Sequence, residues 1–340
     1  MDDILEAGTS PLIVSQPPKR GIRWVFEDKD GIRAGWGVLL FVLLFVGFEI
    51  LTGRLLLQFL PRGPHSAGMP VRLGLIMEGA QLAPLFLATG IMALIERRSL
   101  LAYGYQGTAK AIRFISGLVW GFGAISALVL VLWKAHLLVF DGLQLHGAAI
   151  WKYGFAWAFL FVVVAIFEES TVRGYLQFTL TRGIGFWWGA LLLSLLFGFS
   201  HGTNPGESPA GLFGAAATGL VLCLSLWYTG SLWWALGCHA SWDWAESYFY
   251  GTSDSGVVAQ GHLLGEHPIG QRLWSGGATG PEGSLLALGV LAIMALFMWL
   301  WWRNRVQSPF LDSGWRPVWS RRPALEPTAG LVEPQNLTAS

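Results

Sequence analysis

The sequence has little charge and few cysteines. Charged residues make up 13% of its 340 residues, against roughly 25% in an ordinary soluble domain. The net charge of +1 gives no basic excess, which argues against nucleic acid as a partner. Two cysteines, Cys223 and Cys238, are too few for a disulfide framework or a zinc ribbon. Residues 1–31 lack the apolar core of a signal peptide, so we expect a polar tail there.

Apolar residues are abundant instead. Hydrophobic residues make up 53% of the chain, the mean hydropathy is +0.50, and there are 19 Trp. A soluble protein of this size cannot hide so much apolar surface, because its exterior must face water. A helix that crosses a membrane needs about 20 mostly apolar residues. The sequence therefore predicts an all-α, polytopic membrane helix bundle with about eight transmembrane helices, near residues 34–53, 73–95, 114–135, 155–181, 186–202, 210–228, 231–250 and 284–302.

This pattern divides the chain into three parts. We expect a polar N-terminal tail (1–31), a membrane-embedded helical domain (32–306, with its motif core at 155–250) and a flexible C-terminal tail (307–340). Basic residues gather before the first span, after the second and fourth, and after the last. Because short cytoplasmic loops carry the excess of Lys and Arg, both termini are predicted to be cytoplasmic. The sequence thus predicts a multi-pass integral protein of the cell membrane.

Several ionisable residues lie inside the predicted spans. A charge at the bilayer centre costs about 2.5–3.5 kcal/mol on insertion scales, so each needs a reason. Three spans carry groups suited to acid–base chemistry, namely Glu168, Glu169 and Arg173 on the fourth, His201 on the fifth, and His239 and Asp243 on the seventh. Taken singly, each has a structural explanation as a buried ion pair or a packed histidine. Their joint occurrence on three spans favours a catalytic site.

The depth of these residues follows from helix geometry. If Ile184 marks the turn between the fourth and fifth spans, Glu168 lies 16 residues before it and His201 lies 17 residues after it. At about 1.5 Å rise per residue, the two side chains lie at nearly the same height. His239 begins closer to the end of its span and needs a tilted or offset helix to reach that layer. We expect the three residues to meet in one cavity, open to the cytoplasmic side.

The two adjacent glutamates point in different directions. Glu169 and Arg173 are four residues apart, on one helix face and in the favourable acid-before-base order, so we expect an ion pair. Glu168 then has no partner on its own helix and is available to take a proton from water. Two further acids are interpreted differently: Glu246 as interfacial, and Glu78 as an interhelical hydrogen-bond partner.

The three motifs resemble those of a known family. Glu168-Glu169-x-x-x-Arg173, Phe197-x-x-x-His201 and His239-x-x-x-Asp243 are similar to the motifs of the CPBP intramembrane proteases. These include the type 2 CAAX prenyl endopeptidases and bacteriocin-processing or immunity proteins like lysostaphin resistance protein A. Thr229–Trp233, before the third motif, and Gly280–Ser284, before the last span, also resemble the family. The resemblance covers roughly residues 73–302.

The resemblance implies an intramembrane endopeptidase that acts on a membrane-associated protein or peptide within the lipid bilayer. Glu168 and His201 would activate the attacking water. Glu169 and Arg173 would hold the geometry of the site, and His239 with residue 243 would stabilise the oxyanion. Asp243 stands where the family often has Asn, and an ionised Asp cannot donate a hydrogen bond. Asp243 would then orient His239 or remain protonated.

Two alternatives remain open at this stage. The family is often labelled metalloprotease, and zinc bound by Glu168, His201 and His239 is one alternative. Because the compact H-E-x-x-H motif is absent, we favour water activated by glutamate without a metal or other cofactor. The other alternative is a non-catalytic membrane protein, such as a bacteriocin immunity protein, scaffold or transporter, that retains the site residues. A transporter would more often show broken helices and inverted repeats.

Overall fold

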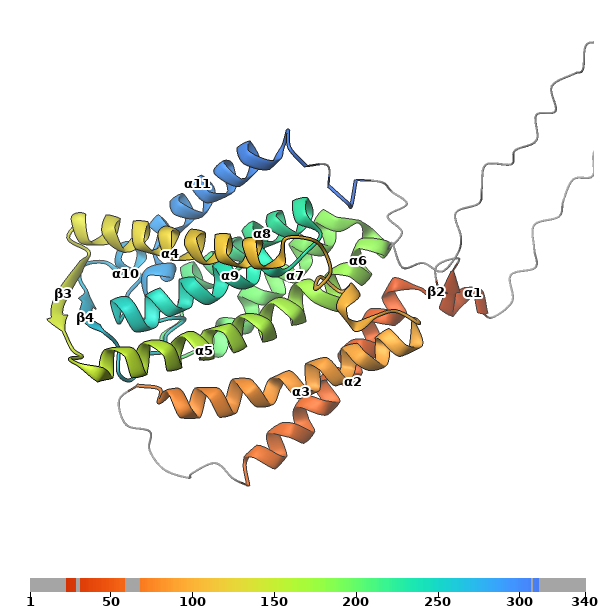
Figure 1. Cartoon of the computed structure of the whole chain (residues 1–340), viewed down its shortest axis with the longest axis horizontal. Coiled ribbons are helices and arrows are strands. Elements are labelled where there is room, and N and C mark those ends of the chain that lie inside the picture. The colour runs from red at the N-terminus through yellow and green to blue at the C-terminus, as the bar shows by residue number, and fades with distance from the viewer. Residues whose placement is uncertain (1–22, 29–30, 59–67, 307, 312–340) are drawn as a thin grey trace, which may run out of the picture.

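The chain folds into an elongated bundle of helices (Figure 1). The computed structural model describes residues 23–28, 31–58, 68–306 and 308–311. The long helices, each formed from an apolar run, are α2 (Ala34–Leu56), α3 (Val71–Ile95), α4 (Lys110–Lys134), α5 (Ala148–Ser170), α7 (Phe186–Ser200), α8 (Pro209–Thr229), α9 (Trp233–Asp243) and α11 (Leu285–Trp302). Shorter helical segments are α1 (Arg23–Phe26), η1 (Leu100–Ala102), η2 (Thr171–Leu176), α6 (Gln177–Ile184), η3 (His201–Thr203), η4 (Trp244–Tyr250), α10 (Arg272–Ser275) and η5 (Pro281–Gly283).

Six helical segments of the described chain are long and apolar enough to cross a membrane. They are α2, α3, α4, the continuous segment from α5 through α6, α8 and α11. The other two predicted spans, 186–202 and 231–250, form α7, which has 15 residues, and α9 followed by η4. The helical membrane bundle is therefore confirmed. The count of eight spans and the cytoplasmic termini remain predictions.

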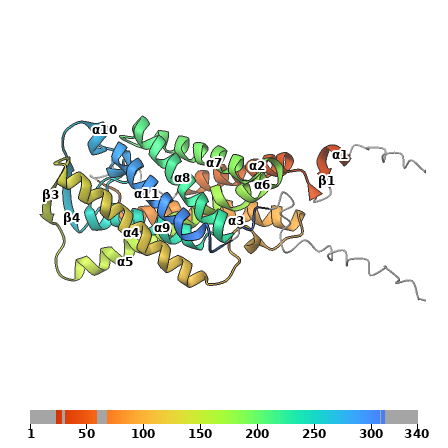
Figure 2. The ribbon, with the colours of Figure 1, turned by 90° about the horizontal axis from the view of Figure 1, so that it is seen from above.

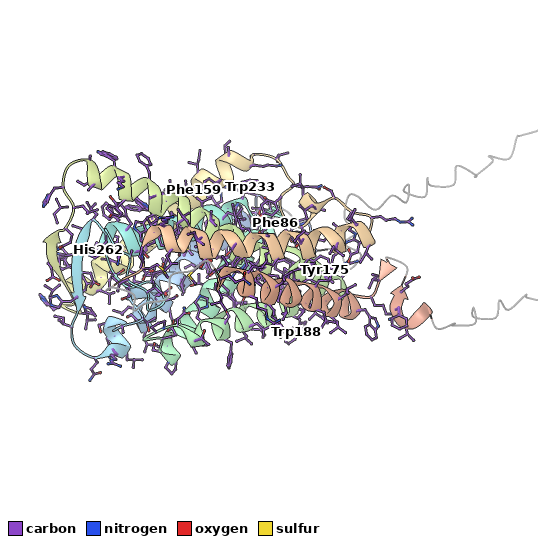
Figure 3. The ribbon with its side chains drawn as sticks, turned by 90° about the horizontal axis from the view of Figure 1, so that it is seen from below. Phe86, Phe159, Tyr175, Trp188, Trp233 and His262 are labelled. Atoms are coloured by element: carbon purple, nitrogen blue, oxygen red, sulfur yellow. The ribbon has the colours of Figure 1, made fainter. Side chains whose placement is uncertain are left out.

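Large apolar side chains cover the outside of the bundle. Phe159 is 63% exposed, Trp188 69% and Phe199 79%, whereas Tyr175 is fully buried among the helices. Figure 3 shows Phe159 and Trp188 on outer helices and Tyr175 within the bundle. Many large apolar side chains exposed on one surface mark contact with a membrane or with a partner. Here they fit contact with lipid.

Sheet is confined to two short pairs at opposite ends of the bundle (Figure 2). β1 (Glu27–Asp28) pairs with β2 (Gly31–Ile32) next to α1. At the other end, β3 (Leu138–Leu143) pairs antiparallel with β4 (Leu264–Pro268), with an irregular register between Phe140 and Gly142. β4 and α10 belong to the Gly-, Ser- and His-rich segment 252–281, which covers that end.

Glycines allow α4 and α9 to approach closely. A Cβ added at Gly121 would lie 2.0 Å from the carbonyl oxygen of Cys238, and one added at Gly237 would lie 2.1 Å from that of Phe114. No side chain fits at such distances, so both positions require glycine for this packing. Small residues let membrane helices pack backbone to backbone. This contact fixes the height of α9, and with it the height of His239.

The described residues beyond α11 pack against the bundle. Phe310 is 7% exposed and contacts the rings of Phe186 and Trp227. The Ser308 hydroxyl donates to the carbonyl oxygen of Trp227 at 2.6 Å. Residues 308–311, which the sequence assigned to the C-terminal tail, are thus part of the packed structure. Residues 312–340 and most of the predicted N-terminal tail lie outside the described residues.

Candidate active site

Two π-helical turns carry the chain past the candidate site. Glu168 and Glu169 lie in the last turn of α5, and Arg173 lies in the π-helical segment η2 that follows, where Gly174 departs from helical dihedrals. The second π-helical segment, η4, follows directly after Asp243, the last residue of α9. Single π-turns inside α-helices are frequent at functional sites, because the extra residue re-aims the side chains around it.

Glu169 and Arg173 form the ion pair expected from their spacing. Nη1 of Arg173 lies 2.5 Å from Oε1 of Glu169, and both side chains are completely buried. Arg173 also donates from Nε to the carbonyl oxygen of Gly219 at 3.4 Å, and its guanidinium lies 5.2 Å from the ring centre of Phe197. A charge so deeply buried is tolerated only with a partner. The pair therefore anchors η2 to α5 and α8.

His239 lies among three carboxylates. Its Nδ1 is 2.8 Å from Oε1 of Glu169, and its Nε2 is 3.3 Å from Oδ2 of Asp243 and 3.5 Å from Oε2 of Glu168. The helix α9 is thus offset so that His239 lies at the depth of Glu168 and Glu169. Because carboxylates only accept hydrogen bonds when ionised, His239 is the donor in these contacts. Its imidazole connects the first and third motifs.

His201 enters the site from the end of α7. Its Nδ1 lies 2.8 Å from the carbonyl oxygen of Phe197, one helical turn earlier. Since a carbonyl only accepts, the proton is assigned to Nδ1, which leaves Nε2 of the neutral ring as an acceptor. The Phe197 ring packs 4.7 Å from the His201 ring and 6.5 Å from the His239 ring, measured between ring centres. The Phe197 ring thus packs against both histidine rings.

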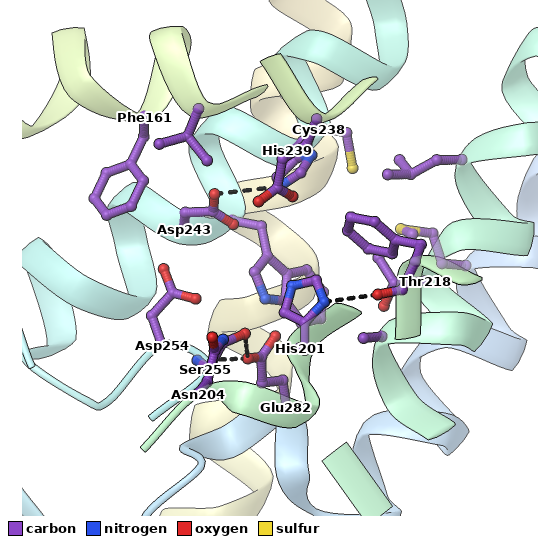
Figure 4. A pocket seen from close by; sticks show the side chains of 17 residues that line it. Phe161, His201, Asn204, Thr218, Cys238, His239, Asp243, Asp254, Ser255 and Glu282 are labelled. Atoms are coloured by element: carbon purple, nitrogen blue, oxygen red, sulfur yellow. Dashed lines mark hydrogen bonds and ion pairs between the residues drawn. The ribbon is translucent and has the colours of Figure 1, made fainter. Parts of the chain in front are cut away.

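Glu168, His201, His239 and Asp243 line one cavity of about 130 Å³ (Figure 4). Apolar walls come from side chains such as Phe161 and Phe197. The structure thereby brings together the four residues that the sequence proposed for catalysis, whereas Glu169 and Arg173 lie behind them. A concave site with apolar walls and a few convergent polar groups is the usual form of a binding or active site.

The cavity lies away from the described ends of the chain. Asp254, Ser255 and Glu282 line it. Their segments lie toward the β3–β4 end of the bundle, whereas α1 lies at the opposite end (Figure 1). If the termini are cytoplasmic, the cavity is directed toward the outer side of the membrane. The side of the membrane to which the cavity opens stays a prediction.

Sequence reasoning missed the acids of this end. Glu282 lies in the Gly280–Ser284 segment, which was noted for its resemblance alone, and Asp254 lies in a loop without periodicity. Burial raises the pKa of the carboxyl groups of both Asp254 and Glu282. Glu246, expected at the interface, is fully buried and accepts a hydrogen bond from the Trp242 indole at 2.8 Å. Glu78, expected to bond between helices, accepts from Gln81 of its own helix.

The zinc alternative does not fit this geometry. A metal ion needs its ligand atoms close together, at about 2.0–2.2 Å from one centre. Among the described residues, Glu168, His201 and His239 do not form a group whose ligand atoms all lie within 4.8 Å of one another; Glu246, Asp254 and Glu282 do.

The motif-bearing segment matches a known family. Residues 149–245 match the family model of type II CAAX prenyl endopeptidase Rce1-like proteins. This match supports the resemblance of the three motifs to the CPBP/CAAX protease family. The matched segment runs from α5 into η4 and contains all seven named residues of the three motifs. Neither the curated proteins nor the solved structures gave a match to the chain. With its six long apolar helical segments, the chain is a multi-pass integral membrane protein.

Proposed function

We propose that this protein is an intramembrane endopeptidase that hydrolyses a peptide bond with water activated by Glu168 and His201. The observation that carries the proposal is the shared cavity of Glu168, His201, His239 and Asp243, within a segment that matches a protease family. Glu168 has no basic partner on its own helix, and Nε2 of His201 is free to accept a proton. Both are placed to serve as general bases.

The proposed reaction needs no group beyond water and the substrate. Glu168, assisted by His201, removes a proton from water as its oxygen attacks the carbonyl carbon. The carbonyl oxygen becomes an oxyanion, which accepts a hydrogen bond from Nε2–H of His239. As the C–N bond breaks, the proton returns from Glu168 to the departing amine. The first products are a carboxylic acid and an amine that carries the proton taken from water. The proton that remains on the acid then passes to the amine, which gives a carboxylate and an ammonium group.

Asp243 acts through His239 in this scheme. Its Oδ2 lies 3.3 Å from Nε2 of His239 and orients the ring before the substrate reacts; the oxyanion then takes over this Nε2–H. Glu169 holds the other ring nitrogen, Nδ1, and is itself neutralised by Arg173. The ring is therefore fixed from both sides, as a preorganised oxyanion donor requires. This favours the orienting role among the two that the sequence left open for Asp243.

The substrate class follows from the location of the site. A cavity lined by residues of α5, α7 and α9 is reached from within the helix bundle, so we propose a membrane-associated protein or peptide as substrate. Cells that carry Glu168→Ala should accumulate an intact protein that wild-type cells cleave. Comparison of membrane fractions by mass spectrometry would identify it. A proteome identical in wild-type and Glu168→Ala cells would contradict a protease and favour the non-catalytic alternative.

A further inference from the structure

Three acidic side chains outside the three motifs meet beside the cavity. Glu246 lies on η4, Asp254 on the loop that follows, and Glu282 on η5 just before α11. One carboxylate oxygen of each lies within 4.8 Å of the others. Figure 4 shows Asp254 and Glu282 near Ser255 at the edge of the cavity. Segments far apart in the sequence thus converge to place three carboxyl groups together.

Each carboxylate is held by a local donor. The Trp242 indole donates to Oε2 of Glu246 at 2.8 Å, and the Ser247 hydroxyl donates to Oδ2 of Asp254 at 3.0 Å. The backbone N–H and the hydroxyl of Ser255 donate to Oε1 of Glu282 at 2.7 and 2.6 Å. These bonds use one oxygen of each acid. The second oxygen of each acid is then available to the cluster.

Glu246 provides a second, independent sign of a ligand. Its side chain is fully buried, and its Oε1 has no hydrogen-bond partner in the described structure. This atom faces Gly280, where an added Cβ would lie 3.3 Å from it, and Gly280 has a φ of 111° that favours glycine. An unbonded oxygen in a buried carboxylate costs free energy unless a cation or donor is bound there.

Among the described residues, no lysine or arginine forms an ion pair with the cluster, and His201 is a basic group that acts electrostatically on Glu282. The ion pairs of the described residues include none with Glu246, Asp254 or Glu282. Three carboxylates in contact repel one another, and burial increases that repulsion. A divalent cation would remove it, because the ion supplies the missing positive charge at the centre of the three oxygens.

The geometry points to Ca²⁺ as the ligand: we propose that Glu246, Asp254 and Glu282 bind a calcium ion. All donors are oxygens, which hard cations prefer over softer metals. Ca²⁺ is commonly held by several protein carboxylates at once, whereas Mg²⁺ usually keeps several waters and takes one or two carboxylates. Three carboxylates close together therefore fit Ca²⁺. Water molecules would complete the coordination.

The ion would connect parts of the fold that border the catalytic cavity. It would hold the Asp254–Ser255 segment and the start of α11 against η4, directly after the third motif. The site is separate from the proposed catalytic residues, and its test needs no substrate. If calcium does not bind, the proposal of protease activity therefore still stands.

Terbium luminescence tests this site directly. Tb³⁺ takes oxygen ligands like Ca²⁺ and emits when a nearby indole is excited, and the Trp242 indole nitrogen lies 2.8 Å from Glu246. The purified full chain in detergent, first treated with EGTA, should show saturable Tb³⁺ emission that Ca²⁺ displaces. Ca²⁺ alone should raise Tm by about 2 °C or more, since a ligand that binds the folded state stabilises it. Absence of both effects in the wild type overturns the proposal.

Variants locate the site. Glu246→Gln and Asp254→Asn should each lose the Ca²⁺-dependent rise in Tm. Asp141→Asn, which changes an exposed carboxylate paired with His267 on another element, should keep it. Trp242→Phe retains all three carboxylates, so it should keep the rise in Tm while its Tb³⁺ emission falls severalfold. An equal response in wild type and Asp254→Asn would place calcium elsewhere and overturn the assignment, even if Glu246→Gln fails to fold.

Discussion

The Nδ1 atom of His239 lies 2.8 Å from Oε1 of Glu169, although the two residues are 70 positions apart in the sequence. The same oxygen atom also accepts a hydrogen bond from Nη1 of Arg173. This shared oxygen links the first and third motifs behind the cavity. Glu169 and Arg173 do not line the cavity, but through this oxygen they position the groups proposed for catalysis.

Removal of Arg173 should destabilise the fold. Arg173→Ala leaves the buried Glu169 carboxylate without its main partner, and breaking such a pair costs about 3–5 kcal/mol. Thermal unfolding in detergent should show a much lower Tm together with poor expression. Arg303→Ala, which removes an exposed arginine stacked on Trp299, is the matched control and should unfold like wild type. Normal stability of Arg173→Ala would show that this pair is not structural.

His201 should matter for activity more than for stability. Its Nδ1 contacts only nearby groups, the Phe197 carbonyl oxygen at 2.8 Å and the Ser200 hydroxyl at 3.4 Å, so the side chain ties no distant segments together. His201→Ala should therefore lower turnover by about 10²-fold or more with a small change in Tm. His262 provides a matched control, because its Nδ1 makes the same kind of contact to the Ala259 carbonyl outside the cavity. Cleavage assays on both variants would separate the roles. Equal activities of His201→Ala and His262→Ala would remove His201 from the mechanism.

Proteolysis should survive a zinc chelator. The ligand atoms of Glu168, His201 and His239 are not grouped as a metal site, so o-phenanthroline should leave turnover of the purified enzyme nearly unchanged. A parallel assay with EGTA tests the effect of calcium alone, because EGTA removes Ca²⁺ and leaves the proposed catalytic side chains in place. Complete inhibition by o-phenanthroline, reversed by added Zn²⁺, would make the three residues metal ligands and overturn the metal-free mechanism.

Cysteine labelling should resolve which side of the membrane the cavity faces. The native Cys223 and Cys238 are buried, so an introduced exposed cysteine would dominate the reaction with a membrane-impermeant maleimide. With cytoplasmic termini, His146→Cys at the β3–β4 end should react in intact cells, whereas Lys110→Cys at the start of α4 should react after lysis. The reversed pattern would place the cavity toward the cytoplasm and contradict the orientation predicted from the basic residues.

Local features of the site could be predicted from the sequence. The spacing of Glu169 and Arg173 predicted their ion pair, because residues four apart share one helix face. The hairpin arithmetic placed Glu168 and His201 at one depth, and both line the cavity. These inferences needed only the geometry of a helix and a single turn.

Features that depend on packing between distant segments could not be predicted. The height of His239 is set by the glycine contacts of α4 with α9, which no periodicity encodes. Asp254 and Glu282 reach the cavity through an irregular segment, and the π-turn after Asp243 directs Glu246 inward instead of toward the interface. Tertiary contacts decided each of these positions.

The most direct test of the account is the turnover of Glu168→Gln with the substrate identified by trapping. The substitution keeps the shape of the side chain and removes the base, so cleavage should fall by about 10²–10⁴-fold with an unchanged Tm. Glu266→Gln, a half-buried glutamate on β4 away from the cavity, is the control and should cleave at the wild-type rate. Wild-type turnover in Glu168→Gln would contradict the proposal that Glu168 activates the attacking water.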